Sequence, residues 1–227
     1  MLLPPRRSEY GNTFGPRRNN WITTLIYELP FGSGKRFASS SSALNAIIGG
    51  WQTSNIFLVQ SGPFLTPVFS GGDPSGTGSG TFDGRPQHPD RVGPWAPGAQ
   101  NSAQWILSSA FVCPTGNCAV GTGNTNAPAP IGRFGTSGVG IIEGPGTINW
   151  DFAVSKSFNL TERARLRFEV SFVNVLNHVN LGIPDMNITD VNNPSQGLCG
   201  FGCITSAQGL YQFAGARSGQ IGARIDF

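Results

Sequence analysis

Arg163-Ala-Arg-Leu-Arg-Phe-Glu-Val-Ser-Phe172 alternates polar and apolar residues without interruption. Successive side chains of a β-strand point to opposite faces of a sheet, so this order places every apolar side chain on one face. An amphipathic helix would instead repeat its apolar residues at spacings of three and four. The pattern therefore predicts a strand over residues 163–176, whose apolar side carries Ala164, Leu166, Phe168, Val170 and Phe172.

Four other segments have strand character, so the sequence predicts an all-β fold with about five to six long strands. Residues 20–29 and 48–60 are rich in β-branched and aromatic side chains, and residues 64–69 could extend the second segment after a bend. Residues 147–158 alternate well, and a last strand begins near Arg217. The only helical candidate is the short segment 41–48, which lies inside a connection.

The composition limits the classes of partner. Charged residues make up 12% of the chain, about half of the usual 25%. The net charge of +3 is small and its basic residues are scattered, which argues against a nucleic-acid partner. No run approaches the roughly 18 continuous apolar residues of a membrane helix. A membrane barrel stays compatible with this hydropathy, because only every second strand residue faces lipid.

No group of residues forms a recognisable catalytic or cofactor-binding motif. The glycine-rich residues 76–80 are not followed by the Lys-Ser/Thr pair of a phosphate loop. The aspartates at 73 and 83 lack the spaced acidic ligands of a calcium-binding loop. We therefore expect no enzymatic activity, no cofactor and no metal site.

The connections between predicted strands differ greatly in length, and the very long ones do not follow each other directly along the chain. Residues 159–162 form a short turn, whereas about 67–146 and 178–216 are long and rich in Gly and Pro. Outer-membrane barrels have short periplasmic turns and long external loops. This parity predicts a partial antiparallel transmembrane barrel with two long extracellular loops and a periplasmic C-terminus, although the connection over residues 30–45 is long for a periplasmic turn.

The four cysteines form two close pairs, Cys113 with Cys118 and Cys199 with Cys203. Turn-forming residues separate the members of each pair, so local disulfides have the lowest loop-closure cost. Neither pair has the two-residue spacing typical of zinc knuckles. Disulfides are the favoured interpretation and imply an oxidising compartment, with a metal site or free thiols as alternatives.

Charged and aromatic residues fit the same barrel. An arginine on a lipid-facing surface near the midplane would cost about 2–4 kcal/mol, so the charged side of these strands should face the lumen. The predicted lumen-facing charges are Arg163, Arg165, Arg167, Glu169 and Arg224. The aromatic residues near segment ends, where barrels carry aromatic girdles, are Trp21, Tyr27, Trp51, Trp150 and Phe158.

Several runs resemble the C-terminal strands of TonB-dependent receptors, above all the Oar-like receptors with a carboxypeptidase-regulatory-like domain. The run from Asn149-Trp-Asp-Phe-Ala-Val to His178 carries most of this resemblance. Residues 27–37, 49–52 and 60–64 look like the same family further upstream, and residues 220–227 are similar to its closing strand. The resemblance covers about half of the residues and nearly all of the predicted strands.

The resemblance implies a gated outer-membrane transporter, whose barrel of about 22 strands is filled by a plug and energised by the TonB complex. This sequence contains no recognisable plug or TonB-contacting segment, so we expect a C-terminal fragment that would reach TonB only through missing N-terminal parts. Residues 1–19 would be the remnant of an extracellular loop and residues 20–227 the barrel strands. The imported ligand cannot be inferred from these residues.

The closing residues alternate and end on an aromatic side chain. Their apolar positions, Ile221, Ala223, Ile225 and Phe227, resemble the terminal strand that the barrel-assembly machinery recognises. The expected partners are therefore outer-membrane lipid, the assembly machinery and an unknown ligand. The alternative from a different class is a secreted all-β surface or adhesion module, in which the apolar faces would form the core of a sandwich.

Overall fold

The structure is a computed structural model that describes residues 10–68, 74–75, 87–114, 132–161, 163–190, 198–208 and 215–227. These residues divide into two compact units. The sheet unit contains the described residues of 20–60, 147–180 and 209–227. The loop unit contains those of 1–19, 61–146 and 181–208.

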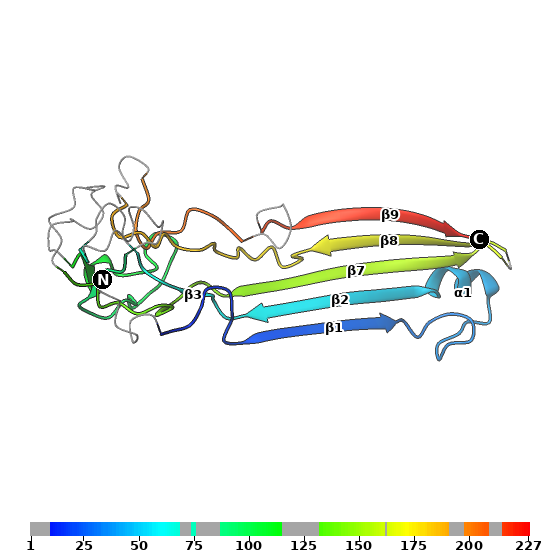
Figure 1. Ribbon diagram of the computed structural model, residues 1–227. Coiled ribbons are helices and arrows are strands. Elements are labelled where there is room, and N and C mark those ends of the chain that lie inside the picture. The colour runs from blue at the N-terminus through cyan, green and yellow to red at the C-terminus, as the bar shows by residue number, and fades with distance from the viewer. Residues whose placement is uncertain are drawn as a thin grey trace. The chain divides into compact units, whose positions relative to one another are not determined.

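The sheet unit is one antiparallel sheet of five long strands in the order β1-β2-β7-β8-β9 (Figure 1). Their bounds are β1 Asn20–Glu28, β2 Trp51–Gln60, β7 Thr147–Asn159, β8 Arg165–Val173 and β9 Ser218–Asp226. Each neighbouring pair is hydrogen-bonded in a continuous antiparallel register. The predicted all-β, antiparallel fold is confirmed, because the period-two pattern of long segments was a sound guide to the strands.

The connection between β1 and β2 contains α1, Ser42–Ile48, whose N-cap is Ser41. The Ser41 hydroxyl accepts a hydrogen bond from the backbone N–H of Leu44 at 3.4 Å, as N-cap serines commonly do. Segment 41–48, the predicted helical candidate, therefore does form a helix. In the described part of the chain, no helix has both the length and the apolar character of a membrane span.

The turn between β7 and β8 includes residues that the alternating sequence pattern assigned to the strand. The Thr161 hydroxyl accepts hydrogen bonds from the N–H groups of Arg163 and Ala164, and the Ala164 carbonyl accepts from those of Leu160 and Thr161. This network draws Arg163 into the turn, so β8 begins only at Arg165. The prediction that Arg163 lies on the charged side of the strand was therefore wrong.

The loop unit is built from coil and very short elements. Two small antiparallel ladders pair β3, Phe64–Leu65, with β6, Ile142–Glu143, and β4, Asp90–Arg91, with β5, Phe111–Val112. The 3-10 helix η1, Ser108–Ala110, leads directly into β5. The regions predicted to be two long irregular loops therefore contain secondary structure of their own.

These connections also share a hydrophobic core. The buried cluster contains Leu65, Ile106, Ala110, Phe111, Cys113, Ile142, Ile188 and Phe201, drawn from both long connections. The Phe111 and Phe201 rings meet edge to face with centroids 5.7 Å apart. The two long connections thus form one folded unit rather than two separate loops.

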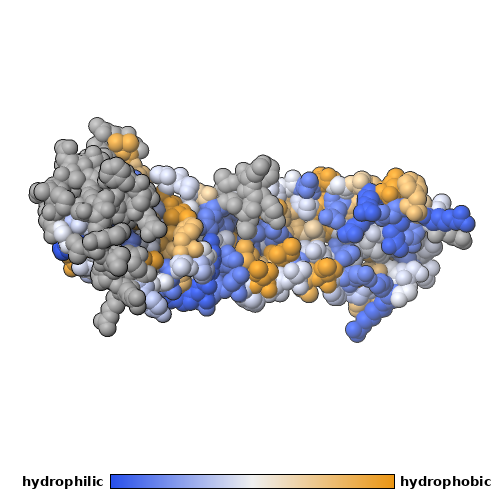
Figure 2. Space-filling model, in the orientation of Figure 1, coloured by the Kyte–Doolittle hydropathy of each residue, from blue (hydrophilic) through white to orange (hydrophobic). Residues whose placement is uncertain are grey.

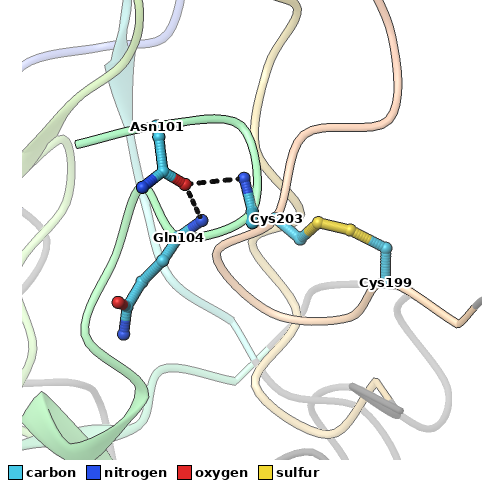
Figure 3. Close-up of a disulfide and its surroundings, with 5 residues drawn as sticks. Asn101, Gln104, Cys199 and Cys203 are labelled. Carbon is cyan, nitrogen blue, oxygen red and sulfur yellow. Dashed lines mark hydrogen bonds between the residues drawn. A yellow bond between two sulfur atoms is a disulfide. The ribbon is translucent and has the colours of Figure 1, made fainter. Parts of the chain in front are cut away.

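Backbone hydrogen bonds join the same two connections. Val68 exchanges bonds with the segment 186–188: its N–H donates to the Met186 carbonyl, and its carbonyl accepts from Ile188. The N–H of Trp105 donates to the carbonyl of Gly202 at 2.8 Å. Beside this contact a disulfide joins Cys199 to Cys203, next to the turn in which the Asn101 side chain accepts from the Gln104 N–H (Figure 3).

Candidate functional site

The register of the long strands places alternate residues from all five on one face, here called the apolar face. Phe168 of β8 lies opposite Lys156 of β7 on one side and Ala223 of β9 on the other. Lys156 in turn lies opposite Trp51 of β2. On β7, β8 and β9 this face carries Ile148, Trp150, Phe152, Val154, Phe158, Leu166, Phe168, Val170, Phe172, Ile221, Ala223 and Ile225.

Large apolar side chains of this face are exposed, as they would not be in a water-soluble sheet. Ile221 is 80% exposed, Trp21 67% and Phe168 43%. Among the described residues, Leu58 is the only buried hydrophobic residue of the sheet unit, and every other one belongs to the loop unit. Figure 2 shows hydrophobic residues lying open on the face of the molecule that it presents.

The opposite face of β7, β8 and β9, here called the polar face, carries hydrogen bonds and ion pairs between its side chains. Arg167 pairs with Glu169 at 3.0 Å and Arg224 with Asp226 at 2.6 Å. The Asp151 carboxylate accepts from the Asn149 side chain at 2.7 Å. The predicted lumen-facing charges that share this face are Arg165, Arg167, Glu169 and Arg224.

Between β8 and β9 the polar face is hollowed. Arg167, Glu169 and Ser171 of β8 line an open depression together with Gln220 and Arg224 of β9. Arg167 and Arg224 are direct cross-strand partners, yet each guanidinium pairs with a carboxylate on its own strand. These intrastrand pairs reduce the repulsion that like charges placed opposite each other would otherwise cause.

β1 and β2 are less one-sided than the other three strands. Trp21 and Tyr27 lie on the apolar face, but Ile22, Ile26 and Ile56 lie on the same side as the polar face. All three isoleucines are more than 40% exposed. The polar face therefore changes from charged to apolar across the sheet.

The five aromatic residues predicted from segment ends all lie on the apolar face. Trp150 stacks on Phe57 with centroids 4.9 Å apart, and its indole N–H donates to the Asn55 side chain at 3.2 Å. Phe158 lies at the other end of the same strand, β7. At about 3.3 Å per residue, these two rings are about 26 Å apart along the strand, which a tilt of about 40° reduces to about 20 Å. This spacing is comparable to the apolar band of barrel proteins, which is about 25 Å tall.

The predicted closing-strand residues keep their alternation. Ile221, Ala223 and Ile225 lie on the apolar face, opposite Val170, Phe168 and Leu166 of β8. Phe227 follows the last residue of β9 and is 97% exposed.

Sequence reasoning missed one polar residue of the apolar face, Lys156. It interrupts the apolar series between Val154 and Phe158, and it is only 5% exposed. Its ammonium group lies 4.9 Å from the Phe158 ring centroid and 5.4 Å from that of Trp51. A lysine in the apolar series of a strand was the available signal, because such a charge needs a partner that the strand itself does not supply.

The loop unit holds three of the four predicted disulfide cysteines, Cys113, Cys199 and Cys203, and two acids with shifted pKa values. Cys113 is buried and disulfide-bonded, while its predicted partner Cys118 lies outside the described residues. Burial raises the pKa of Asp185 to about 6, and a hydrogen bond from Arg133 holds the pKa of Asp90 below its ordinary value. No cluster of three or more His, Cys, Asp or Glu able to hold a metal occurs among the described residues.

Comparison with known families identifies this two-faced sheet. The family model described as "Outer membrane beta barrel domain" matches residues 4–220. The chain belongs to this outer-membrane β-barrel domain family. Neither a curated protein nor a solved structure was found to match it. As an outer-membrane β-barrel domain, the chain resides in the cell outer membrane.

Membership of the outer-membrane β-barrel domain family explains the exposed apolar side chains. Barrels of this class present an apolar band to lipid and a polar surface to the lumen, with the two alternating along each strand. The apolar face of β7, β8 and β9 has the character of the first surface, and the polar face has that of the second. A sandwich core fits less well, because stacked sheets would bury the apolar face.

Proposed function

We propose that this outer-membrane β-barrel domain is a wall segment of an Oar-like TonB-dependent receptor. The observation that carries the proposal is the contrast between a sheet with an exposed apolar face and a loop unit with its own buried core. A receptor of this kind needs both a wall in contact with lipid and a folded external surface that a ligand can meet. The resemblance of residues 149–178 and 220–227 to such receptors supports the finer assignment.

The number of strands supports a wall segment rather than a closed barrel. The sheet has five long strands, whereas closed membrane barrels have at least about eight. The outer edges of β1 and β9 therefore need further strands to complete the wall. In the proposed receptor those strands, together with a plug and the TonB-contacting segment, belong to N-terminal parts of the same protein.

The loop unit is proposed to make the first contact with the imported ligand on the extracellular side. Its core draws on both long connections, and its Cys199–Cys203 disulfide closes a short loop within the second of them. Disulfides persist in oxidising compartments. The C-terminus, at the other end of β9, would then be periplasmic. A wall and a binding surface require no catalytic group, so the proposed protein is not an enzyme.

Cross-linking in cells tests the TonB assignment. The test uses the complete protein expressed from its own gene, with every N-terminal part that the gene encodes. An epitope tag can follow Gly98, an exposed position where an added side chain would meet no atom within 4 Å. Formaldehyde should cross-link the tagged protein to TonB, while a porin with the same tag should give no such product. A tagged protein that reaches the outer membrane and never cross-links to TonB would refute the receptor assignment, while leaving the barrel assignment intact.

A further inference from the structure

The short helix α1 presents an unusual surface. After Ser42, its side chains are all apolar except that of Asn45. The Asn45 amide turns toward Ser39, accepting from its N–H and donating to its carbonyl, each at 2.7 Å. Leu44 and Ile47 meanwhile are 46% and 66% exposed. A helix that faces water turns its polar residues outward, and this one does the reverse.

Lys156 fixes α1 beside the apolar face of the sheet. Its ammonium group donates to the carbonyl oxygens of Ala46 at 2.8 Å and Ile47 at 3.0 Å, and to that of Gly49. The last carbonyls of a helix have no partner within the helix, and a cation is favoured at that end. The lysine therefore has its charge satisfied by α1, although it lies among the apolar residues of β7.

Two further contacts hold the same end of the helix. The Trp51 indole N–H donates to the Ile47 carbonyl at 3.0 Å. Gly32, whose φ is +98°, lies so close to Gly49 that a Cβ on Gly32 would be 2.5 Å from the Gly49 Cα. This close approach needs glycine, and it ties the start of the connection to the end of α1. Figure 1 shows α1 at the end of the sheet where the C-terminus lies.

We propose that α1 is an interfacial membrane anchor whose Leu44 and Ile47 side chains enter the lipid leaflet at this end of the barrel wall. The inference rests on the proposed function only in assigning the apolar face to lipid. Its occupant is outer-membrane phospholipid, because α1 is continuous with that face through Lys156, Trp51 and Phe158. Aromatic rings and cations are typical of such interfaces. The neighbouring Arg36 guanidinium lies 5.6 Å from the Phe37 ring centroid, and Phe37 is 52% exposed.

Lys156 is a positioning residue in this account. Without it, the carbonyls of Ala46 and Gly49 lose the ammonium donor, and the Ile47 carbonyl keeps only the Trp51 indole. Among the described side-chain bonds, those that still join the connection over residues 29–50 to the sheet are Trp51 to Ile47 and Lys35 to Glu28. Methionine at this position would suit a lipid-facing strand and should leave the sheet intact. The attachment of α1 to the sheet should weaken.

Spin labels can locate α1 relative to the bilayer. Single cysteines replace Ile47, the exposed Ser33 of the same connection, and Phe168 of the sheet, in the full chain purified from outer membranes and returned to phosphatidylethanolamine–phosphatidylglycerol vesicles. The described cysteines are all disulfide-bonded, so the introduced thiol takes the nitroxide. Relative collision rates with oxygen, which partitions into lipid, and with water-soluble nickel-EDDA report depth.

The Ile47 label should show an oxygen-to-nickel ratio several-fold above that of Ser33, as expected for a position in lipid. A ratio equal to that of Ser33, with the Phe168 label in lipid, would overturn the anchor alone. A Phe168 label in water would overturn the lipid assignment of the sheet and the anchor with it. Lys156→Met should make the Ile47 label several-fold more accessible to nickel, and Lys156→Arg should not. An unchanged Ile47 label in the methionine variant would refute the positioning role.

Discussion

The sheet unit and the loop unit use apolar residues in opposite ways. The sheet unit has long regular strands, yet its described large apolar side chains, apart from Leu58, are exposed or only half-buried. The loop unit has strands of only two residues, yet it buries Ile106, Phe111, Ile142 and Ile188 almost completely. Regular secondary structure and a buried core are therefore separate properties. The solvent decides which one a segment needs, with lipid against the sheet and water around the loop unit.

Truncating one isoleucine in each unit should give the largest difference in stability between the two units. Ile142 is fully buried in the loop-unit core and Ile221 is 80% exposed on the sheet. Ile142→Ala should cost about 2–5 kcal/mol, because it removes buried contacts and leaves a cavity. Ile221→Ala should cost well under half of that, since lipid fills the space. Hydrogen exchange resolved by region measures both free energies, and equal losses would contradict the contrast between the units.

Charge placement on the two faces of β8 should give the next largest effect. Phe168→Arg puts a charge on the apolar face, where an arginine costs up to about 2–4 kcal/mol, with the largest cost at the midplane and a smaller one toward the interface. Arg167→Ala removes a charge from the polar face, where the ion pair with Glu169 is half-exposed and worth less than about 1 kcal/mol. The fraction of protein assembled in the outer membrane should fall far more for the first variant. Equal losses would mean that the faces are assigned wrongly.

Removal of the Cys199–Cys203 disulfide should affect the loop unit alone. The bridge closes a short loop, with a sequence separation of 4, so the chain-entropy estimate for its loss is about 2 kcal/mol. The paired Cys199→Ser and Cys203→Ser variant should exchange faster around the contact between Trp105 and Gly202, with strands β7 to β9 unaffected. Faster exchange throughout the sheet would show that the two units are not independent.

A smaller effect of pH should also fall on the loop unit. Burial raises the pKa of Asp185 from its ordinary 3.8 to about 6, so folding favours the protonated carboxyl. This group therefore adds stability that is fully present below pH 3.8 and is lost as the pH rises through about 6. Exchange in the loop unit should accelerate from pH 4 to pH 7 after correction for the intrinsic rate. Asp185→Asn should flatten that dependence, and a slope unchanged by this substitution would exclude Asp185 as its source.

The sequence predicted the sheet unit far better than the loop unit. Long alternating segments such as residues 165–173 carry their own signal, because each strand faces two different environments along its whole length. The core of the loop unit has no such local pattern. Phe111 and Ile142 come from two-residue strands, and Phe201 reaches them from the other long connection. Their burial depends on long-range contacts that no periodicity encodes.

At the level of single residues, the sequence misled where a hydrogen-bond partner outside the strand determined a residue's position. Arg163 follows the alternation but is drawn into the turn by the Thr161 hydroxyl. Lys156 breaks the alternation because the carbonyls of α1 bind its ammonium group. Both partners come from connections rather than from strands, so the strand pattern alone could not reveal them.

A nitroxide scan along β8 tests most directly the claim that one face of the sheet meets lipid. Labels placed singly from position 165 to position 173, in vesicles, report the ratio of oxygen to nickel-EDDA collisions. The account predicts a period of two, with lipid exposure at 166, 168, 170 and 172 and water exposure at 165, 167, 169 and 171. A scan without alternation, or with the opposite phase, would contradict it.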